Sequence, residues 1–283
     1  MTQITAEMVR DLRERTGVGM MDCKKALVAA NGEMDLAIET LRKAGQATAV
    51  KKGSRIAAEG VVSVAVTADK KSAIIVEVNC ETDFVAREAR FKAFAQQIAN
   101  KSLSDVEEAR LALVGQLGEN IVVRRERTVK AEAAGTVAAY VHGGEAGAAQ
   151  IGALVAISVD DANLAKDLTM HIAAMKPEYI SEADVPAERV AKEKEILLAQ
   201  AQEANAGKPI EILEKIISGK IGKFIKEITL VGQPFIKNTD QTVGALLDSH
   251  KAKVTDFVRF EVGEGIEKVA TDFVSEVMSQ VKG

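Results

Sequence analysis

Residues 79–85 read Asn-Cys-Glu-Thr-Asp-Phe-Val and place a carboxylate beside an aromatic ring. The alternating run 73–80 predicts a half-buried strand that ends here, and the run 85–100 predicts a helix that begins here. Thr82 is a favourable helix N-cap, and Asp83 supplies the negative charge that a helix N-terminus favours. No base, nucleophile or metal-ligand set accompanies the carboxylate and the ring in this segment, so they are poorly suited to catalysis. They are better suited to insertion into another protein from a rigid corner.

Spacing alone leaves the role of Phe84 open. Phe84, Phe91, Ala95 and Ile98 are separated by seven, four and three positions, which is also the spacing of a buried helical stripe. Aromatic side chains with such spacing usually belong to a core, which favours core packing over a protruding ring by about two to one. A lone Asp83 is likewise more often a helix-start charge than a functional acid.

The composition is typical of a soluble globular protein with two or three domains. The 283 residues are 47% hydrophobic and 28% charged, with a net charge of -4. The chain has no Trp and no basic patch interleaved with aromatic residues, which disfavours nucleic-acid binding. Neither a signal peptide nor an apolar run of membrane-spanning length occurs, so we expect a cytoplasmic protein that does not bind membranes.

Cysteine and histidine positions argue against an enzyme. Cys23 and Cys80 form no CxxC motif and have no histidine near them in sequence, so we expect buried thiols in a reducing compartment. His171 lies on an apolar helical face and is expected in the core, whereas His142 is expected to be exposed in a loop. No phosphate-binding glycine loop, HExxH motif or Ser-His-Asp signature occurs. The sequence therefore predicts no catalytic site, metal, cofactor or direct nucleotide binding.

The first 45 residues predict three short helices separated by glycines, with Gly45 expected to end the third. Three helices of this length form a small bundle of the ubiquitin-associated type. Residues 46–55 predict a polar, basic linker. The first 55 residues contain ten basic and seven acidic side chains, a balance of +3 that weakly favours an acidic partner surface.

After the linker, a pattern of strands and helices occurs twice. The first copy predicts strands 60–67, 73–80 and 120–127 and helices 85–100 and 104–117. The second predicts strands 135–137, 151–159 and 254–262 and helices 162–174 and 243–250. A divergent duplication of a ββααβ unit accounts for the pattern, and each unit gives a three-stranded antiparallel sheet backed by helices.

An insertion interrupts the second copy. Residues 187–205 and 210–228 each carry one apolar stripe at helical spacing, and Gly207-Lys208-Pro209 separates them. Two such helices joined by a short loop predict an antiparallel hairpin. A structural or oligomerising arm and a partner-binding arm are equally compatible with this pattern.

The fold class that follows is α+β. It combines a three-helix ubiquitin-associated-like bundle, a duplicated core of small three-stranded sheets, an inserted helical hairpin and a short helical module from about Ala270. The predicted boundaries are 1–55 for the bundle and linker, 56–133 for the first core unit, 134–184 with 229–263 for the second, 185–228 for the hairpin and 264–283 for the C-terminal module.

Three segments resemble motifs of the bacterial translation elongation factor Ts family. Residues 12–27 read Leu-Arg-Glu-Arg-Thr-Gly-Val-Gly-Met-Met-Asp-Cys-Lys-Lys-Ala-Leu and resemble its N-terminal motif. Residues 79–85 resemble its central motif. Residues 257–268 read Phe-Val-Arg-Phe-Glu-Val-Gly-Glu-Gly-Ile-Glu-Lys and resemble its C-terminal signature. The motifs are long and specific, and the match runs nearly end to end.

The resemblance implies a guanine nucleotide exchange factor for elongation factor Tu, the GTPase that delivers aminoacyl-tRNA to the ribosome. It implies that the central motif inserts beside the partner's magnesium site through Thr82, Asp83, Phe84 and Val85. For Phe84, this implication replaces the core interpretation. GTP would then displace the factor, and no bond would be made or broken by it.

The resemblance also implies contacts from two other segments. The bundle would contact the partner's nucleotide-binding domain through Leu12, Arg13, Met20 and Met21. A Tyr-x-His-Gly turn would face the partner's third domain through Tyr140, His142 and Gly143. Whether two copies pair within the complex is left open by the sequence.

Two other classes of function are weighed against this one. A ubiquitin-associated-type adaptor is suggested by the first 45 residues alone, but it leaves four-fifths of the chain unexplained. An enzyme that uses Cys80 or Asp83 would require a reactive thiol or an activated acid. The reactivity of Cys80 toward alkylating agents therefore separates the enzyme from the binding protein.

Overall fold

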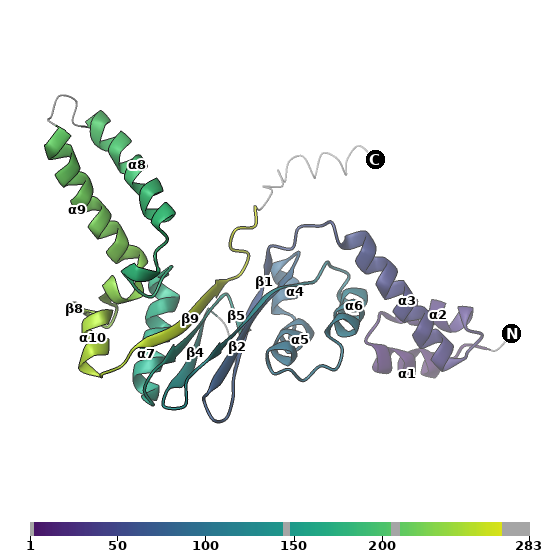
Figure 1. The fold of residues 1–283 in the computed structure, drawn as a ribbon. Helices are drawn as coiled ribbons and strands as arrows, with labels where there is room; N and C mark the ends of the chain where they lie inside the picture. Colours follow the sequence, from purple (N-terminus) through teal and green to yellow (C-terminus); the bar gives the residue numbers. More distant parts are fainter. Residues whose placement is uncertain (1–2, 144–147, 205–209, 268–283) are drawn as a thin grey trace.

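The computed structural model describes residues 3–143, 148–204 and 210–267. Within these ranges the chain forms a helical bundle, a central pair of sheets covered by helices, and a helical hairpin that projects from the body (Figure 1). The bundle and the hairpin lie at opposite ends of the molecule. This is the predicted α+β architecture. The predicted helix from about residue 270 and the predicted hairpin loop at 207–209 lie outside the described residues.

The bundle consists of α1 (Ala6–Thr16), α2 (Met20–Ala29) and α3 (Met34–Lys52). Thr5 caps α1, since its hydroxyl accepts a hydrogen bond from the Met8 N–H. Gly17 ends α1 with a left-handed φ of 67°, which glycine adopts without steric cost. Leu12, Cys23 and Leu27 are fully buried where the three helices meet.

The third helix is longer than the sequence analysis predicts. The expected end at Gly45 is wrong, and α3 continues through most of the expected linker. Gly45 lies where α3 packs on α6 (Val106–Leu117), and a Cβ there would be 3.3 Å from the Leu111 carbonyl oxygen. The glycine serves the close approach of two helices, a tertiary requirement that is invisible in local sequence.

The first sheet is antiparallel and has the order β3-β2-β1-β5. Its strands are β1 (Glu59–Val66), β2 (Ser72–Cys80), β3 (Val122–Lys130) and β5 (Ala148–Ala149). The two-residue β5 adds a fourth strand to the three that were predicted, with Ala149 opposite Val62. Helices α5 (Ala89–Ala99) and α6 cover one face, where Val78, Phe91 and Val114 belong to the core.

The second sheet has the order β4-β6-β9, with β4 (Thr136–His142), β6 (Ile151–Ile157) and β9 (Val254–Glu261). Helices α7 (Ala162–Met175) and α10 (Val243–Ser249) pack on one face. The two sheets share a core of their own, in which Val62 and Ile75 of the first approach Gly152 of the second. A Cβ on Gly152 would lie 2.6 Å from Val62 Cγ1, so glycine permits the close stacking.

The insertion forms the predicted antiparallel hairpin of α8 (Ala187–Ala204) and α9 (Ile210–Ile228). Ala201 and Ile217 are buried between the two helices, with Leu197 and Ile221 packed beside them. The remaining elements are the short helix α4 (Asp83–Arg87), the 3-10 helices η1 (Glu182–Asp184) and η2 (Leu230–Gly232), and the strands β7 (Pro234–Phe235) and β8 (Asn238–Thr242). The predicted domain boundaries stay predictions, and most of the predicted C-terminal module lies outside the described residues.

Candidate protein-interaction site

The corner, residues 79–85, joins the end of β2 to the short helix α4 (Asp83–Arg87). Thr82 is the N-cap as predicted, and its hydroxyl accepts a hydrogen bond from the Val85 N–H at 3.4 Å. Glu88 then adopts an extended conformation with φ -65° and ψ 134°, and α5 begins at the next residue. The predicted single helix over 85–100 is therefore broken in two, because Glu88 leaves the helical region.

Phe84 lies on the outside of the corner and is 80% exposed. The residues that follow it turn inward, since Ala86 is buried and Val85 packs against the core of the first sheet. The core interpretation of Phe84 is wrong. A large aromatic ring held in water by a structured turn is unusual, and such rings are typical anchors of protein–protein interfaces.

Asp83 is half-buried beside Phe84 and pairs with Arg87 one helical turn later, at 2.8 Å. Both side chains of this ion pair are accessible to solvent, so the pair contributes little to stability. Asp83 also lines a hollow of about 530 Å³ together with Gly143 and Gln150 of the second sheet. Tertiary structure therefore brings the corner to the turn that follows His142.

His142 is the last residue of β4, and its side chain is exposed as predicted. Its Nδ1 lies 3.2 Å from the Tyr140 hydroxyl, and the two rings are 6.3 Å apart between centroids. The sequence analysis predicts His142 in a loop, whereas the structure places it at the end of the strand. Gly143, the residue after His142, lines the same hollow as Asp83, 60 positions earlier in the chain.

The bundle presents apolar side chains to solvent at the start of α2. Met20 is 51% exposed and Met21 is 66% exposed. Arg13 is exposed as well and forms no ion pair within the part of the chain that the structure describes. Leu12 is fully buried in the bundle core, so its side chain is not available for the expected contact with a partner. Its amphipathic spacing matches a core position, and packing determines where it points.

The bundle is fixed to the core next to these methionines. Gln116 of α6 donates a hydrogen bond from Nε2 to the Thr16 carbonyl at 2.7 Å, and Arg90 of α5 donates to the Gly17 carbonyl at 3.4 Å. An ion pair between Arg42 and Glu108 joins α3 to α6. The exposed methionines are therefore held in a defined position relative to the sheet domain.

The enzymatic alternative finds no support at Cys80. Both cysteines are buried free thiols, as predicted. The Cys80 thiol donates to the Thr82 carbonyl at 3.2 Å. Burial, with a further contribution from the Glu119 carboxylate, raises the pKa of the thiol to about 12. A thiol that stays protonated at neutral pH is a poor nucleophile.

No cluster of three His, Cys, Asp or Glu side chains suited to a metal ion occurs among residues 3–143, 148–204 and 210–267. None of the helices placed by the structure is long and apolar enough to cross a membrane.

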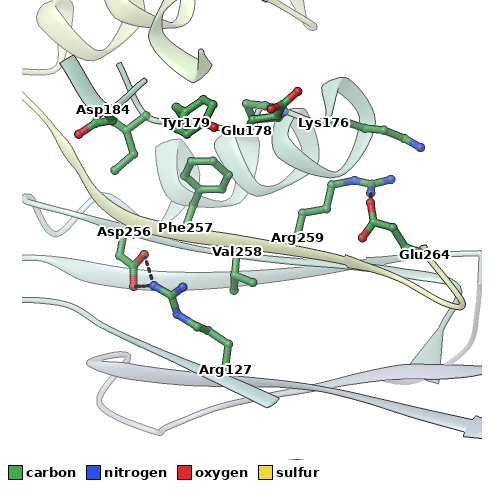
Figure 2. A pocket seen from close by; sticks show the side chains of 12 residues that line it. Arg127, Lys176, Glu178, Tyr179, Asp184, Asp256, Phe257, Val258, Arg259 and Glu264 are labelled. Carbon is green, nitrogen blue, oxygen red and sulfur yellow. Dashed lines mark hydrogen bonds and ion pairs between the residues drawn. The ribbon is translucent and has the colours of Figure 1, made fainter. Parts of the chain in front are cut away.

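A second hollow of about 440 Å³ lies between β9 and the segment that precedes the hairpin (Figure 2). Arg127 and Asp256 pair with each other at 2.9 Å on one side of it. Arg259 contacts Glu264 at 3.8 Å on the other side. Lys176 pairs with Glu261 at 2.7 Å. Because these cations already have carboxylate partners, this hollow offers little net charge to a ligand, and the corner remains the better candidate site.

The fold and the corner define an α+β protein with an exposed ring and an acid at the corner and exposed methionines on the bundle, features suited to contact with another protein. The family model described as "Elongation factor TS" matches residues 81–264. The chain is 52% identical to "Elongation factor Ts" of Thioalkalivibrio sulfidiphilus (strain HL-EbGR7), over 99% of each chain. It is 50% identical to "Elongation factor Ts" of Yersinia pestis (strain Pestoides F), over 100% of this chain and 99% of the other. The chain belongs to the elongation factor Ts family.

Proposed function

We propose that this protein is a guanine nucleotide exchange factor for elongation factor Tu in translation elongation. The observation that carries the proposal is Phe84, which projects into solvent from a rigid corner in a chain of this family. The protein acts by binding and makes or breaks no bond. Its functional site is therefore a surface, to which Phe84, Asp83 and Val85 of the corner contribute together with the exposed start of α2.

The corner promotes nucleotide release by disturbing the phosphate and magnesium site of the partner. Nucleotide phosphates are held by a metal ion and by backbone N–H groups at a helix N-terminus. A ring inserted between partner helices displaces those groups, and each lost charge-assisted hydrogen bond weakens nucleotide binding by about 1.5–3 kcal/mol. Asp83 adds negative charge next to the metal site, where it competes with the phosphates for the cation.

The bundle supplies affinity for the partner and fixes the direction of approach. Met20 and Met21 present adaptable apolar surface, and Arg13 presents a charge without an intramolecular ion-pair partner in the described chain. His142 gives a third point of contact, since the adjacent Gly143 lines the same hollow as Asp83. Contacts at three separate segments suit a factor that must hold its partner while moving one part of it.

Exchange is reversible because the coupling between the two ligands is reciprocal. If this protein lowers the affinity of the partner for nucleotide by a given ratio, nucleotide lowers the affinity of the partner for this protein by the same ratio. Abundant GTP therefore displaces the protein, and a small amount of it serves many partner molecules.

Release of a fluorescent GDP analogue from elongation factor Tu tests this function. We expect sub-stoichiometric amounts of the protein to accelerate release many-fold, and we expect excess GTP to dissociate the complex. If release is unchanged while both proteins are folded, the exchange function is wrong, and the adaptor alternative regains weight.

A further inference from the structure

Glu119 lies in the four-residue loop 118–121 that connects α6 to β3, and its carboxylate binds the backbone of the corner. It accepts hydrogen bonds from the Glu81 N–H at 3.1 Å and the Thr82 N–H at 3.0 Å. The Thr82 hydroxyl donates to its other oxygen at 2.6 Å. One side chain thus satisfies three donors of the corner. Hydrogen bonds to an ionised carboxylate are stronger than those between neutral groups.

The hydroxyl of Thr82 links Glu119 to the helix that carries Phe84. Because the hydroxyl donates its proton to Glu119, its lone pairs are free to accept from the Val85 N–H. The N-cap bond is long at 3.4 Å, so the cap alone holds α4 weakly. Glu119 fixes both the backbone of Thr82 and the orientation of its cap.

The same loop also binds the end of α3. Asn120 donates from its backbone N–H to Glu81 Oε1 at 2.6 Å and from Nδ2 to the Arg55 carbonyl at 2.8 Å. Lys52 donates to the Gly118 carbonyl. Arg55 pairs with Glu81 at 3.2 Å. The loop therefore holds the corner on one side and the last turn of the bundle's long helix on the other.

Phe84 needs this support because its own ring makes almost no contact with the body. An 80% exposed ring can move partner atoms only if the backbone below it resists displacement. The neighbouring side chains on α4 contribute one buried residue, Ala86. Val85 packs half-buried against the core beside Ala86, and the hydrogen bonds at Glu81 and Thr82 hold the backbone in front of α4.

We propose that Glu119 is a positioning residue for nucleotide exchange, which holds the corner so that Phe84 acts as a rigid wedge. This inference rests on the exchange function proposed above. A positioning role differs from a purely structural role in one respect. Loss of a positioning Glu119 is predicted to lower the maximal rate of exchange more than the affinity for the partner. Sequence patterns do not reveal it, because a single acid between Gly118 and Asn120 has no distinctive spacing.

The test compares wild type, Glu119→Gln and the control Glu126→Gln. Glu126 is a carboxylate on β3 that pairs with Lys101 and does not contact the corner. Glu119→Gln keeps the shape but removes the charge, so the bonds accepted from the Glu81 and Thr82 N–H groups weaken, and its NH₂ group cannot accept the proton that the Thr82 hydroxyl donates to Glu119. We expect the maximal rate of GDP release to fall at least tenfold for Glu119→Gln, with the half-saturating concentration within about threefold of wild type. Glu126→Gln is expected to behave as wild type.

Two further measurements separate the possible failures. Amide hydrogen exchange of the free protein should be faster at Glu81 and Thr82 in Glu119→Gln, whatever the partner assay shows. In a Phe84→Ala background, Glu119→Gln should have little further effect on the rate, because both residues act through the same ring. An active wild type with an equally active Glu119→Gln overturns this inference alone. Unchanged amide protection overturns it as well, whereas an inactive wild type refutes the exchange function.

Discussion

Phe84 and Phe91 lie seven residues apart in the chain and occupy opposite environments. The ring of Phe84 is 80% exposed, whereas Phe91 is fully buried against the first sheet. The extended residue Glu88 separates them, so the short helix α4 and the longer α5 do not share one continuous face. Phe91 fills the core position, and Phe84 is left free to contact a partner.

Replacing each phenylalanine by alanine should separate function from stability. Phe84→Ala is expected to change the free energy of unfolding by less than about 0.5 kcal/mol, because an exposed ring gains little from burial. It should slow GDP release from elongation factor Tu strongly. Phe91→Ala is expected to cost about 3–5 kcal/mol, because it leaves a cavity. Urea unfolding and the release assay measure both quantities, and a large stability loss in Phe84→Ala would contradict the exposed position.

The exposed methionines should contribute affinity and little stability. Met21→Ala is expected to raise the half-saturating concentration of the factor and to leave the maximal exchange rate near that of wild type. The reason is that Met21 lies on the bundle, away from the corner, and is 66% exposed. Leu27 lies in the core of the same bundle, so Leu27→Ala should instead lower the free energy of unfolding by about 2–5 kcal/mol. A Met21→Ala variant with normal affinity would remove α2 from the interaction surface.

Cys80 should resist alkylation in the folded protein. Burial and the nearby Glu119 carboxylate raise the pKa of its thiol to about 12, so almost no thiolate forms at pH 8. Mass spectrometry after brief treatment with iodoacetamide is expected to show no modified cysteine in the native protein and modification of Cys23 and Cys80 in urea. Rapid modification of Cys80 without urea would restore the enzymatic alternative.

His171 should make stability depend on pH on the acid side. Its Nδ1 accepts from the Ile236 N–H at 3.2 Å, so Nε2 carries the proton and donates to Gln233 Oε1 at 2.9 Å. Burial lowers the pKa of this imidazole below its usual range, partly opposed by the hydrogen bond to Gln233. Below about pH 6.5 the unfolded chain binds a proton that the folded protein does not. Stability then falls with decreasing pH, by at most about 1.4 kcal/mol per pH unit from this group.

The matched variant for this dependence is His171→Gln, which can donate and accept but does not titrate. Its stability is expected to be lower at pH 7.5 than that of wild type, and its loss between pH 7 and pH 5.5 is expected to be smaller. Urea unfolding at both pH values measures the difference. Equal losses in the two proteins would mean that other groups cause the acid sensitivity.

Much of the fold follows from local patterns. The helices of the bundle, the two arms of the hairpin and the main strands of both sheets appear where their apolar periodicity predicts them. The N-cap at Thr82 and the buried His171 are predicted correctly for the same reason, since capping and amphipathic spacing are properties of a few adjacent residues. The role of Gly45 is not predicted, because it depends on its contact with Leu111 of α6, which lies 66 residues further along the chain.

The sequence by itself determined the family resemblance, the class of fold and the segments in which the candidate site residues lie. Only the tertiary structure decided how these residues are presented. In the folded chain Leu12 is buried and Phe84 is exposed. Asp83 and Gly143 line one hollow, and Glu119 accepts hydrogen bonds from the backbone of the corner. The physical reason is that periodicity specifies which face of an element is apolar. Which side chains meet, and which stay in water, depends on breaks such as Glu88 and on contacts between elements far apart in the chain.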